Sequence, residues 1–250
     1  MDHPLCSVVI PAYNGERYLA ECLRSVLSQT LQDIEILVVD DASTDGTRAC
    51  ASAFCETDSR VRLICNEVNR GVAESRNRGV QSARADWVAF LDCDDVWLPD
   101  KLEKQFALQR RTGARLLYTG AACIDGEGKR LERSFTPPAQ IRYRDLLCGN
   151  EIVCSTVLAE KSLLVSHPMT QSRLHEDYIC WLQILKEIGQ AGGLPEDLIL
   201  YRFAEHSKSR NKWKSARMTW ESYGYLGILF PRRCLYFLRY AAHGVKRYFL

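Results

Sequence analysis

The sequence predicts an α/β fold for residues 1–205, with a mostly parallel sheet flanked by helices. Short apolar runs alternate with amphipathic segments through the first half of the chain, which is typical of strand–helix units whose strands pair in parallel. The chain has 250 residues, of which 46% are hydrophobic and 26% charged. That balance is ordinary for a globular protein and allows a large buried core.

Each predicted strand of the first half is followed by a segment whose apolar residues recur every three or four positions. Proline is favoured at the first position of a helix, so we expect Pro99 to open the fourth helix with Leu98 as its cap. The predicted strands are 7–10, 34–39, 61–65 and 87–91, and the predicted helices are 17–29, 45–54, 72–83 and the one that opens at Pro99. The less regular second half predicts a strand at 116–122, a turn at 125–128, a loop at 136–138 and a helix at 176–188.

The cysteines and the N-terminus indicate a reduced, cytoplasmic protein. The 11 cysteines form no C-x-x-C pair, and several lie in apolar runs as small core residues do. No charged stretch followed by an apolar core precedes the first strand, so we expect no signal peptide. The apolar stretches are shorter than the roughly 20 residues of a transmembrane helix.

Polar and acidic residues follow three of the predicted strands at the point where each strand ends. They are Pro11, Ala12, Tyr13 and Asn14 after the first strand, Asp40 and Asp41 after the second, and Asp92, Cys93, Asp94 and Asp95 after the fourth. Ligands bind beyond the carboxyl ends of strands in open parallel sheets. We therefore expect these segments to converge on one edge of the sheet and to form a binding site.

The segment 92–95 carries three carboxylates, which repel one another unless a cation compensates them. On an extended segment Asp92 and Asp94 point the same way and Cys93 the opposite way. Carboxylate oxygens suit Mg²⁺ or Mn²⁺, ions that bridge proteins to substrate phosphates. The alternative is a solvated acidic turn, and for Asp40 and Asp41 an acidic turn at the strand end is the simpler interpretation.

Glycine-rich phosphate loops are missing from the expected places. The sequence contains neither G-x-x-x-x-G-K-[ST] nor G-x-G-x-x-G after the first strand. A diphosphate would then be held by a metal and by scattered side chains. Arg76, near the start of the third predicted helix, is a candidate for this contact.

Five segments taken in order resemble glycosyltransferases of family 2, which have the Rossmann-like GT-A fold. They are SVVIPAYNGERYLAECLRSVLSQT, EILVVDDASTDGT, NRGVAESRNRG, FLDCDDVWLPDKL and HEDYICW. The resemblance covers about residues 5–205, and the ordered set is specific where each segment alone is weak. It implies a nucleotide-sugar-binding half at 1–100 and an acceptor-binding half at 101–205.

The resemblance also implies roles for individual residues. Pro11, Tyr13 and Asp41 would hold the base and ribose of the donor, with Ala12, Asn14, Glu16 and Asp40 beside them and Arg76 near the base or diphosphate. Asp92, Cys93 and Asp94 match the family's D-x-D element, with Asp94 or Asp95 on the metal and Asp92 near the ribose. The general base would come from the pair Glu176 and Asp177, and we favour Asp177. From the residues alone, stabilisation by the helix dipole is the simpler explanation of an acid in the first turn of a helix.

The implied reaction is an inverting transfer of a hexosyl or N-acetylhexosaminyl group. The usual donors in the resembling family are UDP-sugars, the cofactor is Mn²⁺ or Mg²⁺, and the acceptor is a saccharide or lipid-linked saccharide of the kind used to build bacterial surface polysaccharides. Two alternatives stay open: a catalytically inactive sugar-nucleotide-binding or scaffold protein, and a nucleotidyltransferase. The missing glycine-rich phosphate loop disfavours the latter.

Residues 206–250 form a predicted basic, aromatic and helical tail. Residues 202–250 contain 11 Lys and Arg against two Asp and Glu, and residues 213–250 contain ten aromatics. A helix over 234–250 would align Leu235, Leu238, Ala242, Val245 and Phe249 in one stripe beside a basic stripe. This pattern indicates peripheral contact with the inner face of the cytoplasmic membrane. A helix packed on the protein's own core is the alternative, and the acidic remainder of the chain argues against nucleic acid.

Overall fold

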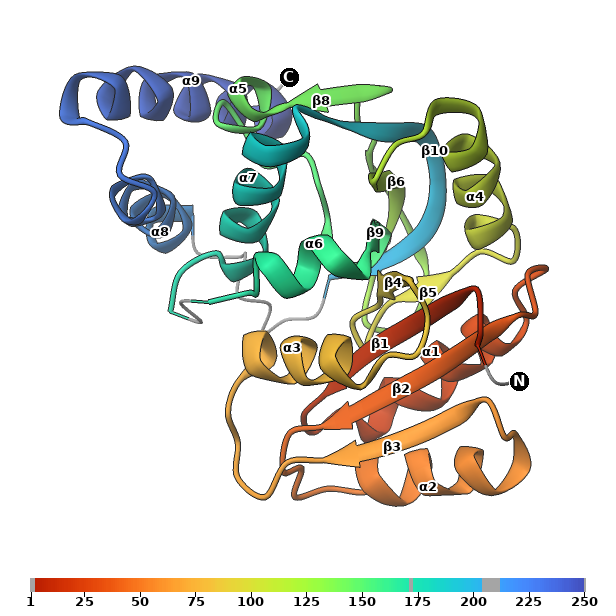
Figure 1. Cartoon of the computed structure of the whole chain (residues 1–250). Helices are drawn as coiled ribbons and strands as arrows, with labels where there is room; N and C mark the ends of the chain where they lie inside the picture. Colours follow the sequence, from red (N-terminus) through yellow and green to blue (C-terminus); the bar gives the residue numbers. More distant parts are fainter. Residues whose placement is uncertain (1–2, 171–172, 204–211, 250) are drawn as a thin grey trace.

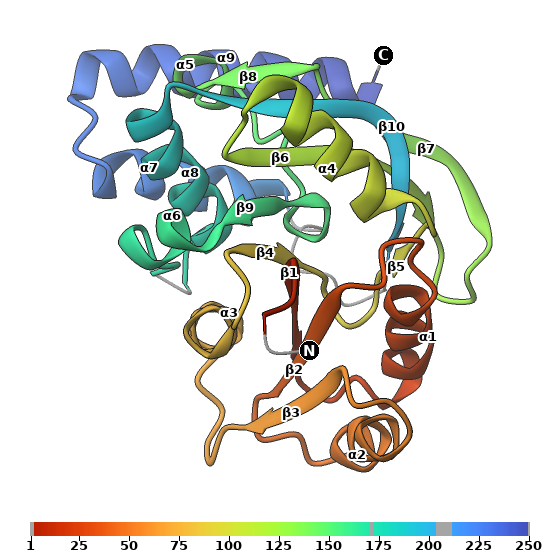
Figure 2. The same cartoon turned by 45° about the vertical axis from the view of Figure 1, so that its right-hand side comes forward.

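The computed structural model describes residues 3–170, 173–203 and 212–249. It contains one 10-stranded sheet in the order β3-β2-β1-β4-β9-β6-β10-β5, with β7 paired to β6 and β8 paired to β10. Helices cover both faces of the sheet (Figures 1 and 2). The predicted α/β class with a mostly parallel sheet is confirmed.

The first four strands, β1 to β4, pair in parallel, whereas β9 runs antiparallel between β4 and β6. The strands are β1 (Cys6–Ala12), β2 (Ile34–Asp40), β3 (Val61–Cys65), β4 (Trp87–Phe90), β5 (Val96–Trp97), β6 (Leu116–Ile124), β7 (Arg130–Phe135), β8 (Gln140–Arg142), β9 (Leu158–Glu160) and β10 (Gln190–Arg202). The helices are α1 (Glu16–Leu27), α2 (Thr47–Thr57), α3 (Val72–Ser82), α4 (Lys101–Thr112), α5 (Tyr143–Leu146), α6 (Lys161–Ser166), α7 (Glu176–Ile188), α8 (Lys212–Tyr225) and α9 (Phe230–Phe249), with a short 3₁₀ helix at Cys154–Thr156.

Two apolar clusters lie on opposite faces of the sheet. One is formed with α1, α2 and α4, and the other with α3, α5, α6 and α7. The strands β1 and β2 are buried along their whole length because both of their faces are covered. This explains why they read in the sequence as continuous apolar runs, not as alternating ones.

The predicted start of the fourth helix is wrong by two residues. Leu98 donates its N–H to Leu198 O at 2.9 Å, which holds this segment beside β10. Pro99 and Asp100 then turn the chain, and Asp100 O accepts the N–H of Lys104 at 3.0 Å. The helix α4 therefore begins at Lys101, and Pro99 precedes it.

The longest strand, β10, was not predicted. Its centre contains Pro195, Glu196 and Asp197, which break the apolar pattern, and its register with β6 shifts twice around them. The strand continues past these irregularities to Arg202. It thereby carries one arginine from the second half of the chain to the carboxyl ends of the first strands.

The C-terminal helices pack on the domain, with α9 running beside α5 and β8 in both views (Figures 1 and 2). Tyr223 of α8 is completely buried in the same apolar cluster as α7, and Tyr236 and Phe237 of α9 pack against that cluster. The predicted helix over 234–250 is confirmed but begins earlier, at Phe230. Leu250 lies outside the described residues, and no helix in the described part of the chain has the length and hydropathy needed to cross a bilayer.

Candidate active site

The candidate site lies where the parallel strands β1, β2 and β4 end. The register pairs Ala12 with Asp40 and Val9 with Phe90, so the three strand ends form one edge of the sheet. The loops that leave this edge carry the residues that the sequence indicated. Pro11 and Ala12 are buried in β1, whereas Tyr13 is 51% exposed and available to a ligand.

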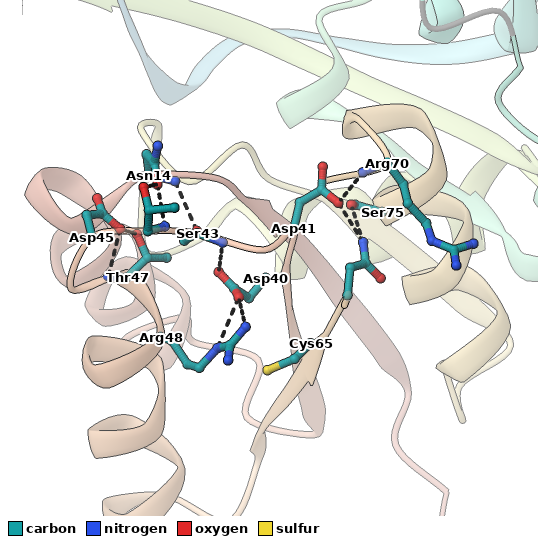
Figure 3. Close-up of polar contacts among 12 residues, drawn as sticks. Asn14, Asp40, Asp41, Ser43, Asp45, Thr47, Arg48, Cys65, Arg70 and Ser75 are labelled. Carbon is teal, nitrogen blue, oxygen red and sulfur yellow. Dashed lines mark hydrogen bonds and ion pairs between the residues drawn. The ribbon is translucent and has the colours of Figure 1, made fainter. Parts of the chain in front are cut away.

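The two acidic residues at the end of β2 point in different directions (Figure 3). Asp40 is completely buried, and its Oδ2 accepts hydrogen bonds from Nε and Nη2 of Arg48 at 3.2 and 3.0 Å. Its Oδ1 accepts the N–H of Ser43 at 3.3 Å. This arrangement gives Asp40 a structural role, joining β2 to α2, in place of the predicted contact with a donor.

Asp41 anchors the loop that leads into α3. Its Oδ1 accepts from Asn66 Nδ2 at 2.7 Å and from the N–H of Arg70 at 2.9 Å, and its Oδ2 accepts the N–H of Gly71 at 2.7 Å. Gly71 has a φ of 88°, a conformation that favours glycine. Asp41 is only 3% exposed, and it joins the end of β2 to the loop that precedes α3.

Asn14 and Glu16 connect the loop after β1 to the loop after β2. Asn14 adopts a φ of 50°, which asparagine tolerates, and its Oδ1 accepts the N–H of Thr44 at 2.9 Å. The carboxylate of Glu16 accepts the N–H of Gly46 at 2.8 Å, at the start of α2, where a negative charge is stabilised by the helix dipole. These bonds make the edge of the sheet one connected framework.

The acidic segment 92–95 forms a turn, and the prediction that it is extended is wrong. Asp95 donates its N–H to Asp92 O at 3.0 Å, with Cys93 and Asp94 at the turn. Cys93 packs against the first loop, where a Cβ on Gly15 would lie 2.9 Å from its Sγ. Because the segment is a turn, its three carboxylates have different surroundings.

Asp95 is held entirely by protein groups. Its Oδ1 accepts the N–H of Arg202 at 2.9 Å, and its Oδ2 accepts the hydroxyl of Ser155 at 2.6 Å. The residue is 1% exposed, and burial, together with the charges of Asp94 and Asp92, raises the pKa of its carboxyl well above the usual value. Asp95 thus fixes the turn, and its geometry disfavours the predicted role as a metal ligand.

Arg202, which the sequence analysis did not identify, clamps the acidic turn from β10. Its Nε donates to Asp94 O at 2.8 Å, its Nη2 to Glu21 Oε2 at 2.7 Å, and its Nη1 to the carbonyls of Asp125 and Gly126 at 3.2 and 3.4 Å. The guanidinium also lies over the ring of Tyr18, 4.5 Å from its centre. A signal was present in the sequence, since an arginine ends a strand there, but the strand itself was not recognised.

Asp94 has the least compensated carboxylate of the three. In the described part of the chain no donor from another residue reaches it. Burial raises the pKa of its carboxyl to about 6, and the neighbouring Asp92 adds to the rise. A carboxylate in this state favours binding of a cation.

Arg76 of α3 joins the two halves of the site. Its Nη2 donates to Asp92 Oδ1 at 2.6 Å and its Nη1 to Glu176 Oε1 at 3.3 Å. The arginine is 4% exposed. Burial disfavours its charge, but the carboxylates of Asp92, Glu176 and Asp177 outweigh this effect and keep the pKa of the guanidinium above its usual value. Arg76 is thus placed as a structural bridge, and its two carboxylate partners come from opposite halves of the chain.

The two acids at the start of α7 differ in accessibility. Glu176 is 8% exposed and bound to Arg76, whereas Asp177 is partly exposed and accepts the N–H of its neighbour Tyr178 at 2.8 Å. Of the pair, Asp177 is therefore the acid that a ligand can reach. A proton acceptor needs that access.

The carboxylates of the acidic turn suit a metal ion that binds together with a substrate. No group of three or more potential metal ligands is found among the described residues, so this part of the chain forms no complete metal cage. Mg²⁺ in phosphate-binding sites is held by one or two carboxylates together with substrate phosphates and water. Asp94, with Asp92 beside it, matches that requirement.

Comparisons with known proteins identify the family of the chain. The model of the family described as Glycosyl transferase family 2 matches residues 7–159. The putative teichuronic acid biosynthesis glycosyltransferase TuaG of Bacillus subtilis is 36% identical over 245 residues, covering 98% of this chain and 97% of that protein. The UDP-Glc:alpha-D-GlcNAc-diphosphoundecaprenol beta-1,3-glucosyltransferase WfgD of Escherichia coli is 34% identical, covering 99% and 96%.

Solved structures share the fold at low sequence identity. Residues 1–349 of S. aureus TarS, in complex with UDP-GlcNAc, superpose with a TM-score of 0.74 at 18% identity, covering 96% of this chain and 72% of that one. The mannosyltransferase PcManGT of Pyrobaculum calidifontis, in complex with GDP-Man and Mn²⁺, gives a TM-score of 0.62 at 19% identity, covering 90% and 64%. These likenesses confirm the predicted GT-A fold.

The Arg202 clamp predicts that lysine cannot replace this arginine. A single ammonium group cannot make the four side-chain hydrogen bonds of the guanidinium. We expect Arg202→Lys to lower the free energy of unfolding in urea by about 2–3 kcal/mol, because buried acceptors lose a charged donor. The matched control is Arg130→Lys, since Arg130 pairs with Asp197 but is 66% exposed, and it should change stability little. Equal stability of the two variants would contradict the clamp.

Proposed function

The chain belongs to glycosyl transferase family 2, and we propose that it transfers a hexosyl or N-acetylhexosaminyl group from a UDP-sugar to a hydroxyl of a lipid-linked saccharide, using Mn²⁺ or Mg²⁺. The observation that carries this proposal is the Arg76 bridge. It places the acidic turn and the start of α7 at one site. Carboxylates suited to the leaving group and to the nucleophile are thereby brought together.

The donor would lie over the carboxyl ends of β1 and β2. Tyr13 is an exposed aromatic side chain there and can pack against the nucleoside, while Asp41 holds the loop at Gly71 that lines the site. The diphosphate would approach Asp94 and Asp92. Support for a UDP-sugar comes from the names of similar proteins, since WfgD is described as using UDP-Glc and TarS is bound to UDP-GlcNAc.

The proposed reaction is a single displacement with inversion. Asp177 accepts the proton of the acceptor hydroxyl while the oxygen of that hydroxyl attacks the anomeric carbon. The bond between that carbon and the diphosphate breaks, and UDP leaves. When bound at Asp94, a divalent metal compensates the negative charge that grows on the diphosphate. Glu176 stays ion-paired to Arg76 and orients the start of α7, which carries Asp177.

The acceptor proposal rests on the described activities of the relatives. TuaG is named for teichuronic acid biosynthesis, and WfgD for transfer to a diphosphoundecaprenol-linked sugar. An acceptor of this class resides in a membrane. We therefore place the enzyme at the inner face of the cytoplasmic membrane as a peripheral protein, with the C-terminal helices in contact with the bilayer.

The role of Asp94 predicts opposite effects on activity and stability. Asp94→Asn should reduce transfer from a UDP-sugar by about 10²-fold or more, because the charge that holds the metal is lost. The raised pKa means that ionised Asp94 destabilises the fold above about pH 6, so the variant should gain stability at pH 8 relative to the wild type. That gain should shrink as the pH falls below about 6 and vanish below about pH 4, where the wild-type carboxyl is protonated in both the folded and the unfolded state.

Radiolabelled product formation, with Mn²⁺ and with excess chelator, measures the first effect, and urea unfolding at several pH values measures the second. Asp86→Asn, at the other end of β4, is the matched control and should behave as the wild type. Full activity of Asp94→Asn, or of the wild type in chelator, would refute the assignment.

The different surroundings of the two acids on α7 predict different defects. Asp177→Asn should lower turnover by about 10²–10⁴-fold with almost unchanged affinity for the UDP-sugar, because the base touches the acceptor. Glu176→Gln should instead lower the free energy of unfolding, because it weakens a buried ion pair of Arg76. Single-turnover assays and calorimetric donor titrations distinguish the two. An active Asp177→Asn beside an inactive but fully stable Glu176→Gln would reverse the assignment.

A further inference from the structure

The helix α9 uses one side for packing and leaves another side in solvent. Tyr236 and Phe237 pack on the core cluster, and Arg233 lies over the ring of Trp220 in α8, 4.0 Å from its centre. Leu235 and Leu238 are 48% and 68% exposed. Leu235 and Leu238, which belong to the apolar stripe that the sequence indicated, are therefore not on the side that holds α9 to the domain.

Two further exposed apolar residues lie at the connection between α8 and α9. Leu229 is 73% exposed and Phe230 is 71% exposed. At about 100° per residue, Leu235, Leu238 and Ala242 fall within about 60° of one another on the helix. We call the exposed set Leu235, Leu238 and Ala242 the apolar stripe.

The charged residues of α9 all have the same sign. Arg232 and Arg239 are exposed and lie about 40–60° from Leu235 around the helix, between the stripe and the packed side. Residues 222–250 contain five Lys and Arg and no Asp or Glu. An apolar band edged by cations, without acids, is complementary to lipid tails beneath anionic headgroups.

We propose that the apolar stripe and its arginines form a docking surface for an anionic lipid bilayer, with α9 lying in the plane of the interface. This deepens the proposed function, on which it rests for the presence of a membrane-bound acceptor. A second copy of the chain fits the surface poorly, because two copies face to face would bring arginines of the same sign together.

The proposed docking surface on α9 is linked to the candidate active site through α8. Ser215 of α8 contacts His175, whose Nε2 lies 3.2 Å from both the hydroxyl and the carbonyl oxygen of Ser215. His175 directly precedes Glu176 and Asp177 at the start of α7. A bilayer held by α9 would thus be positioned, through α8, relative to the acids that receive the acceptor.

The test requires substitutions and not a truncation. Removal of α8 and α9 would take Tyr223, which is completely buried, out of the core, so the shortened chain would report on folding. Leu235→Glu combined with Leu238→Glu changes only exposed positions. The matched control is Val68→Glu combined with Val165→Glu, since these valines are 58% and 56% exposed on other parts of the surface.

The experiment is co-sedimentation of the full chain with phosphatidylcholine vesicles, with and without phosphatidylglycerol. We expect the wild type and the valine control to bind the anionic vesicles, and the leucine variant to bind at least about tenfold more weakly. Arg232→Gln and Arg239→Gln should each weaken binding to anionic vesicles by about fivefold. Salt should weaken binding without abolishing it, because apolar insertion remains.

Equal vesicle binding by the leucine variant and the wild type would overturn the proposal. So would a dimer in analytical ultracentrifugation that the leucine variant alone abolishes, because the stripe would then be covered by a second copy. Transfer to a water-soluble analogue of the acceptor separates this proposal from the proposed function. The leucine variant should keep that activity, and a wild type that binds vesicles but transfers no sugar would refute the function only.

Discussion

The candidate site depends on one buried arginine. Arg76 is almost inaccessible to solvent, and it pairs with Asp92 of the acidic turn and with Glu176 of α7. Removing one partner of a buried ion pair typically costs about 3–5 kcal/mol, because the remaining charge is left without compensation. The Arg76 bridge therefore fixes the acidic turn, which carries Asp94, relative to the start of α7, which carries Asp177. We propose that these two carboxylates serve the leaving group and the acceptor.

Around this bridge, most carboxylates of the site are hydrogen-bonded within the protein, and few remain accessible to a ligand. Asp40, Asp41 and Asp95 have their oxygens occupied by protein donors. The carboxylate of Asp94 is not compensated in this way, and Asp177 remains partly exposed. The proposed metal-assisted transfer benefits from this division, since a rigid acidic framework would keep Asp94 and Asp177 in place without competing for the substrate.

The sequence predicted the donor half well because its elements have regular apolar periods, as β3 and the helix at 72–82 illustrate. The acceptor half was predicted poorly because β10 contains Pro195 and two register shifts, so its pattern is irregular. Asp40 and Asp95 were identified by residue type, but their hydrogen-bond partners Arg48, Ser155 and Arg202 come from other elements, which no local pattern reveals. For the tail, the sequence left membrane contact and core packing as alternatives, and α9 has both a packed side and an exposed apolar side.

The most direct test of this account is a double-mutant cycle between Arg76 and Glu176, measured as the free energy of unfolding in urea. The cycle comprises the wild type, Arg76→Met, Glu176→Gln and the double variant. If the bridge joins the two halves, the double variant should be less destabilised than the sum of the single variants, with a coupling of about 1–3 kcal/mol. Effects that add within about 0.5 kcal/mol would show that the two residues are energetically independent and would contradict the account.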